Sequence, residues 1–89
     1  MPEVSFSSSF KRAFRRRVAA YPLRVDKFWR AVALFRIEPF HPSLKTHKLS
    51  GKLNELMSFS VEYDMRVIFY FSDRNTARFI DIGPHNRVY

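Results

Sequence analysis

The spacing of apolar residues predicts a first strand followed by two amphipathic helices. Val4 and Phe6 alternate with serines, which is typical of a strand, and Ser8 or Ser9 is the expected cap of a helix. The next apolar residues recur every fourth position up to about Ala20: Phe10, Phe14 and Val18. A second helix is predicted from Pro22 to Pro39 by the helical spacing of Val25, Phe28, Trp29, Val32 and Phe35.

The rest of the chain has the pattern of strands. A long irregular loop is predicted from Glu38 to Lys52, because prolines and turn residues interrupt the periodicity there. Residues 57–64 alternate between apolar and polar, residues 66–71 form an apolar central strand, and residues 77–82 form a last strand after a turn at residues 72–75. Phe79 and the pair Ile80 and Ile82 all resemble core residues, so the pattern leaves the buried face of the last strand open.

The predicted order is β-α-α-β-β-β. It indicates an α+β fold in which a helical hairpin packs on one face of a small, mainly antiparallel sheet. The 89 residues allow one domain, residues 1–89, and 46% hydrophobic and 17% aromatic residues are enough for a core.

The composition excludes several classes of protein. The chain has no Cys, so it has no disulfides and no thiolate nucleophile or metal ligand. Its two glycines are too few for a glycine-rich nucleotide loop. We see neither the apolar core of a signal peptide nor a membrane-spanning run, and therefore expect a cytoplasmic protein without membrane attachment.

The charge is positive and concentrated in the first half of the chain. The net charge is +8, and residues 1–52 carry twelve Lys and Arg against three acidic residues. Such a charge attracts polyanions. The polar faces of the first predicted helix carry Lys11, Arg12, Arg15 and Arg16, which we expect to contact a phosphate backbone or an acidic protein partner. A merely solvated face is the alternative.

Three segments are candidates for chemistry. His47 lies among lysines in the predicted loop, where Lys45, Lys48 and Lys52 can hold phosphates and the imidazole can transfer a proton near neutral pH. The alternative is a solvated basic loop. Arg66 can stabilise a pentavalent phosphate, or it can pair with Asp64 or Glu62 at a hairpin.

The C-terminal tail is the third candidate segment. His85 and Tyr89 follow a Gly-Pro turn there, and the alternative for such a histidine is a solvated residue. The three histidines lack the spacing of metal ligands, and we expect no bound metal. A serine hydrolase is excluded because the chain has no G-x-S-x-G motif.

Three motifs together resemble the toxins of bacterial toxin–antitoxin modules. They are HKLSGKL at 47–53, YDMRVIFYF at 63–71 and FIDIGPHNRVY at 79–89. The family is the RelE/ParE superfamily, and the similarity is greatest to its YafQ-like and RelE-like branch. The specific part is the pairing of HxLxG with the terminal IGxHxxVY.

The resemblance implies a type II toxin that cleaves mRNA on the ribosome without metal or cofactor. A base takes the proton of a ribose 2′-OH, the oxygen attacks the adjacent phosphate, and an acid protonates the departing 5′-oxygen. By motif position the catalytic residues are His85, His47, Asp64, Arg66 and Tyr89. The candidate residues for binding RNA phosphates are Lys45, Lys48, Lys52 and Arg87.

The sequence departs from the YafQ-like pattern at three positions. Ser60 stands where that pattern has a second histidine, Met65 where it has an aromatic residue, and Asp81 where it has an arginine. The resemblance therefore leaves two alternatives open: a ParE-like inhibitor of DNA gyrase, or a weakened toxin homologue that only binds its antitoxin. The implied partners are a cognate antitoxin, the ribosome and mRNA.

Overall fold

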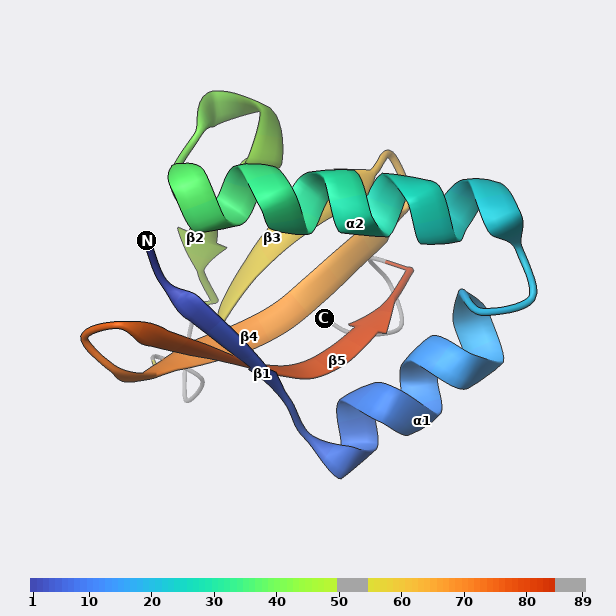
Figure 1. Cartoon of the computed structure of the whole chain (residues 1–89), viewed down its shortest axis with the longest axis horizontal. Helices are drawn as coiled ribbons and strands as arrows, with labels where there is room; N and C mark the ends of the chain where they lie inside the picture. Colours follow the sequence, from blue (N-terminus) through green and yellow to red (C-terminus); the bar gives the residue numbers. More distant parts are fainter. Residues whose placement is uncertain (50–54, 85–89) are drawn as a thin grey trace.

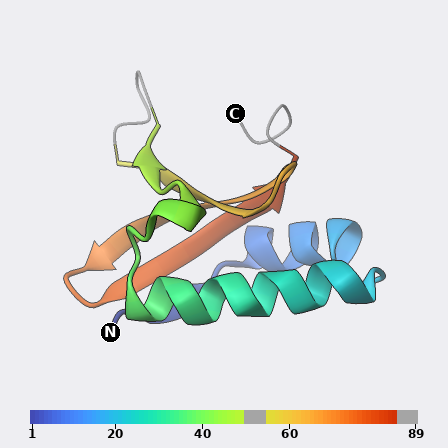
Figure 2. The same ribbon diagram turned by 90° about the horizontal axis from the view of Figure 1, so that it is seen from above.

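One five-stranded sheet, covered by two helices on a single face, forms the architecture of the protein (Figures 1 and 2). The computed structural model describes residues 1–49 and 55–84. The strands lie in the order β1-β5-β4-β3-β2, with β1 parallel to β5 and all other pairs antiparallel. Their bounds are β1 Glu3–Phe6, β2 His47–Lys48, β3 Met57–Glu62, β4 Met65–Asp73 and β5 Thr76–Gly83. The α+β class and the mainly antiparallel sheet are confirmed.

The helices are α1, Ser8–Arg17, and α2, Pro22–Ile37. The predicted cap of α1 at Ser8 or Ser9 is wrong: Ser7 is the N-cap, because its hydroxyl accepts a hydrogen bond from the backbone N–H of Phe10 at 3.0 Å. Pro22 starts α2 as predicted, since proline lacks only a donor that the first turn leaves unpaired. No helix in the described part of the chain is both long and apolar enough to span a bilayer.

The segment from Glu38 to Lys52, predicted as an irregular loop, contains two short regular elements. A short 3₁₀ helix, η1, spans Pro42–Leu44, and the two-residue strand β2 adds an edge to the sheet by pairing with β3. The element order therefore has one more strand than predicted. A two-residue strand carries too little periodicity to be recognised, and its partner strand defines it. Tyr63, predicted in the alternating strand, lies 99% exposed in the turn between β3 and β4.

A cluster of aromatic rings between the helices and the sheet forms most of the core. Phe79 lies at its centre, with six phenylalanine rings at centroid distances of 5.5–6.4 Å. Trp29, predicted as part of the buried stripe of α2, is instead half exposed, and Ala31 is buried. The Trp29 ring meets the edge of Phe6 on β1 and lines an open groove between the two helices, so part of it stays in contact with solvent.

A β-bulge decides which residues of β5 are buried. Ile68 pairs with Asp81 while the next residue, Phe69, pairs with Phe79, so Ile80 is an extra residue without a partner in β4. This insertion brings Phe79 and Ile82, three positions apart, onto the same face toward the helices, where both are fully buried. The question left open by the sequence pattern is thereby resolved.

Candidate functional site

The sheet face turned away from the helices brings together residues from four strands. The pairing register places His47 opposite Ser58, Ser58 opposite Ile68, and Ile68 opposite Asp81. Paired residues of neighbouring antiparallel strands point to the same side. Arg66 lies two positions from Ile68 on β4 and therefore shares this side. We call these five residues the far face; Ile68 is buried there although it is not part of the core cluster.

The far face holds buried polar atoms that lack hydrogen-bond partners. Within residues 1–49 and 55–84 there are three such side-chain atoms: Oγ of Ser58, and Nε and Nη1 of Arg66. Arg66 forms no ion pair with Asp64 or Glu62 among these residues, and Glu62 pairs instead with Lys27 at 3.2 Å. Because native proteins pair nearly all buried polar groups, these unpaired donors indicate a site for an acceptor.

His47 is held in a tautomer that leaves one ring nitrogen available. Its Nδ1 lies 2.8 Å from the carbonyl oxygen of Lys45. A carbonyl only accepts, so Nδ1 carries the proton and donates it, and the neutral ring has its free lone pair at Nε2. Lys45 presents this carbonyl from a left-handed backbone conformation, with φ of 52°, which is uncommon for a residue other than glycine. The exposed imidazole can thus accept a proton at Nε2.

The predicted catalytic residues are only partly brought together. His47 and Arg66 are two strands and two residues apart, roughly 12 Å between Cα atoms by standard sheet spacings. Lys45 and Lys48 are exposed beside His47. Asp64 lies in the β3–β4 turn, more than about 13 Å along the strand from the position opposite His47, and lines a pocket with Arg17 and Arg24. The arrangement supports a joint role for His47 and Arg66 more directly than one for Asp64.

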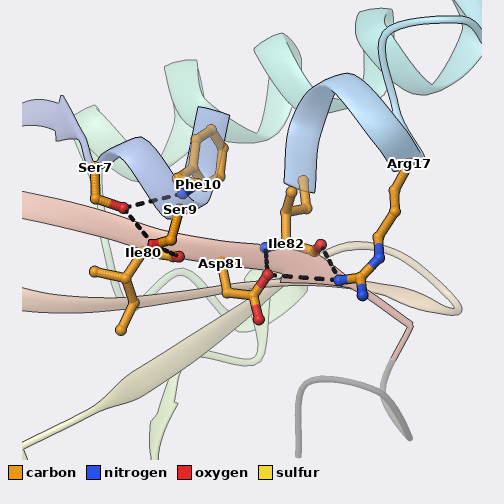
Figure 3. A network of polar contacts seen from close by, with 7 residues as sticks. All are labelled: Ser7, Ser9, Phe10, Arg17, Ile80, Asp81 and Ile82. Atoms are coloured by element: carbon orange, nitrogen blue, oxygen red, sulfur yellow. Dashed lines mark hydrogen bonds and ion pairs between the residues drawn. The ribbon is translucent and has the colours of Figure 1, made fainter. Parts of the chain in front are cut away.

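Side chains of α1 reach the edge of β5 and add a basic residue that the sequence did not single out (Figure 3). β1 pairs with β5 only as far as Phe79. Beyond it, Ser9 donates its hydroxyl proton to the carbonyl of Ile80 at 2.7 Å, and Arg17 donates from Nη1 to the carbonyl of Ile82 at 2.8 Å. Nη1 of Arg17 also lies 3.5 Å from Oδ1 of Asp81. These contacts join residues more than 60 positions apart, which is why sequence spacing gave no signal of them.

The four basic residues predicted as one surface of α1 face two different regions. Arg12 and Arg16 line a pocket with Ile68 and Asp81 and so border the far face. Lys11 and Arg15 border an apolar groove of about 310 Å³ between the helices, whose walls are the rings of Phe6, Phe10, Phe14, Phe28 and Trp29 together with Ala19. Within the described ranges none of the four forms an ion pair. α1 therefore presents positive charge to both regions.

Several predicted site residues lie outside the described residues: Lys52, His85, Arg87 and Tyr89. Their roles stay predictions. Among residues 1–49 and 55–84, no three His, Asp or Glu side chains gather as metal ligands do. Because this observation covers only the described residues, the expected absence of a bound metal stays a prediction.

Comparison with solved structures finds the same fold in bacterial toxins. YafQ of Escherichia coli superposes with a TM-score of 0.77 at 18% identity, covering 100% of this chain and 99% of that one. A metal-bound toxin from Helicobacter pylori gives 0.80 at 19% identity, with complete coverage of both chains. A YoeB/ParE toxin from Agrobacterium tumefaciens gives 0.78 at 15% identity, covering 93% and 98%. The fold predicted from the resemblance to the RelE/ParE superfamily is confirmed.

The sequence itself is distant from characterised proteins. No protein-family model matches it, and no curated protein is similar to it in sequence. At 15–20% identity, the TM-scores of 0.77–0.78 to these solved structures establish a common fold alone. The assignment of an activity therefore depends on the residues of the far face.

Proposed function

We propose that this chain is the toxin of a type II toxin–antitoxin module and cleaves mRNA on the ribosome. The observation that carries the proposal is Arg66, whose guanidinium has two buried nitrogens without partners in the described part of the chain. A phosphodiester oxyanion supplies the acceptors that these nitrogens lack. The fold shared with YafQ and the YoeB/ParE toxin supports the same assignment.

His47 and Arg66 of the far face, together with His85 of the C-terminal tail, supply the groups that such a cleavage needs. One of His47 and His85 takes the proton from the ribose 2′-OH as its oxygen bonds to the adjacent phosphorus. The other donates a proton to the 5′-oxygen as the P–O5′ bond breaks. Nε2 of His47 has the free lone pair that the base requires. Arg66 donates to the phosphate oxygens, where negative charge accumulates in the transition state.

We expect ribosome-dependent cuts in a reporter mRNA that weaken at least about 100-fold in His47→Ala and in His85→Ala, the usual range for loss of a general acid or base. The measurement is a primer-extension map in a reconstituted translation system, with naked RNA as the ribosome-free comparison. His41→Ala is the matched control, because His41 accepts a hydrogen bond from the N–H of Ser43 in η1 and does not belong to the far face. Its activity should stay near that of wild type.

Absence of cleavage by wild-type protein contradicts the proposal. A gyrase supercoiling assay run in parallel then decides between the ParE-like alternative and a homologue that only binds its antitoxin. Cleavage that persists in both His47→Ala and His85→Ala would refute the assigned chemistry while leaving the ribonuclease class intact.

The antitoxin is the partner that we assign to the apolar groove between α1 and α2. Its walls are aromatic, and its rim carries the cationic Lys11 and Arg15. A segment with apolar side chains and acidic neighbours complements such a groove. A solved complex is described as the DinJ–YafQ toxin–antitoxin complex, and this chain superposes on the matched protein with a TM-score of 0.77 at 20% identity.

Trp29 allows this assignment to be tested, because it is the only tryptophan and is 50% exposed at the groove. Binding of the antitoxin should exclude water from the ring and shift its emission to shorter wavelength. We expect Trp29→Ala to weaken binding by at least about 2 kcal/mol, as truncation of a buried aromatic anchor does. Leu23→Ala, at an exposed position of the same helix outside the groove, is the control. An unchanged emission spectrum in the complex would place the antitoxin elsewhere.

A further inference from the structure

Arg17, the last residue of α1, places its guanidinium over the far side of β5. Nη1 donates to the carbonyl of Ile82 at 2.8 Å and lies 3.5 Å from Oδ1 of Asp81 (Figure 3). The side chain is largely covered, with 23% of its surface exposed. Two contacts to consecutive residues of one strand thus hold the charge of a helix residue against the sheet.

Gly83 makes this placement possible. A Cβ atom on Gly83 would collide with Nη1 of Arg17 and come within 3.1 Å of its Cζ. Gly83 pairs with Arg66 across β4 and β5, and side chains of paired residues project from the same side of a sheet. The guanidinium of Arg17 therefore occupies the space beside Arg66 that a side chain at position 83 would fill.

The two arginines carry two positive charges, and the ion pair of Arg17 with Asp81 balances only one of them. Asp81 is the acidic residue that contacts Arg17 in the described ranges, and Nε and Nη1 of Arg66 have no partner there. Two like charges that lie on the same side of neighbouring strands repel each other in a partly buried site. An oxyanion between them removes the repulsion and accepts the hydrogen bonds that Arg66 leaves unmade.

We propose that Arg17 and Arg66 together bind one phosphate group of the RNA, with Asp81 as the residue that positions Arg17. This inference rests on the proposed function and adds a second phosphate-binding arginine to it. The guanidinium of Arg17 comes from α1, and the carboxylate of Asp81 on β5 anchors it.

The test measures phosphate binding separately from cleavage. Wild type and variants are titrated with inorganic phosphate and with a 2′-O-methyl dinucleotide, which cannot be cleaved, and binding is followed by NMR chemical shifts. Arg17→Gln should weaken both ligands about tenfold, the loss expected for a charge-assisted hydrogen bond. Adding Asp81→Arg to Arg17→Gln returns a guanidinium from β5 and should restore most of the affinity. Arg74→Gln, with the same loss of charge in the exposed β4–β5 turn, should bind as wild type does.

Restoration by the double variant separates phosphate binding from a structural role, because Asp81→Arg does not rebuild the contact of Arg17 with Ile82. If Arg17→Gln fails to fold, Arg17→Lys keeps a charge and a donor for the Ile82 carbonyl but loses the fork geometry. We expect Arg17→Lys to bind phosphate several-fold more weakly than wild type does. Affinity in Arg17→Gln or Arg17→Lys equal to that of Arg74→Gln overturns the proposal. The proposal is also overturned if wild-type protein binds inorganic phosphate but does not bind the dinucleotide.

The two proposals fail differently. Phosphate binding that depends on Arg17 in a protein that does not cleave mRNA would refute the proposed activity and retain the phosphate site. Ribosome-dependent cleavage at the wild-type rate by Arg17→Gln would refute the role of Arg17 and retain the activity.

Discussion

Phe79→Ala is expected to lower the free energy of unfolding by about 4 kcal/mol. The ring is fully buried and contacts six other phenylalanine rings from β1, α1, α2, β3 and β4. Its removal leaves a cavity where the helices meet the sheet. Domains of this size are stable by only about 5–15 kcal/mol, so the variant should be partly unfolded at 37 °C. Urea denaturation followed by circular dichroism measures the loss.

Phe71→Ala is the matched control for this prediction. Phe71 also lies on a strand and contacts the rings of Phe35 and Phe69, but it is 36% exposed. Its truncation should cost clearly less, about 1–2 kcal/mol, because water already reaches part of the ring. If Phe79→Ala and Phe71→Ala lower the free energy of unfolding equally, the aromatic cluster is not centred on Phe79.

Arg66→Met is expected to reduce mRNA cleavage at least about 100-fold without destabilising the protein. The guanidinium has two buried nitrogens without partners among the described residues, so its burial costs free energy that hydrogen bonds do not return. Methionine retains an unbranched apolar chain that fills most of the same space. We therefore expect the free energy of unfolding to stay level or to rise by about 1–2 kcal/mol. Primer extension and urea denaturation on the same preparation measure both effects.

Arg78→Met is the control that separates the loss of cleavage in Arg66→Met from a general effect of removing a positive charge. Arg78 lies on β5 and donates from Nη1 to the hydroxyl of Ser5 at 3.1 Å, so its guanidinium has a partner. Cleavage should persist in this variant, and stability should not increase. A marked destabilisation by Arg66→Met would indicate that Arg66 serves the fold, and would contradict its assignment to the substrate phosphate.

Much of the architecture was predictable because it depends on local patterns. The fourfold spacing of Phe10, Phe14 and Val18 repeats on one side of a helix, and Pro22 starts the next helix by its fixed backbone angle. The apolar run at residues 66–71 became the central strand β4. β2 was not predicted, because a strand of two residues is too short to show an alternating pattern of apolar and polar residues. The helix cap was placed one or two residues late, because Ser7, Ser8 and Ser9 are chemically alike.

The candidate site was predictable in its chemistry and less so in its geometry. His47 and Arg66 stood out by residue type and by motif, and the register of β2, β3 and β4 places both on one face. Asp64 stood out for the same reasons, yet it lies in a turn at the end of β3. Arg17 was only one of three consecutive arginines on a helix. Its contact with Asp81 depends on where α1 packs along β5.

The sequence by itself determined the α+β class, the places of the two helices and three longer strands, the positive charge and the motif residues. Each of these follows from the period, composition or backbone preference of neighbouring residues. The tertiary structure decided the bulge that turns both Phe79 and Ile82 inward, the pairing of β2, and the close approach of Arg17 to Gly83, the residue that pairs with Arg66. These depend on packing between segments distant in the chain, where a shift of one residue changes which side chains meet.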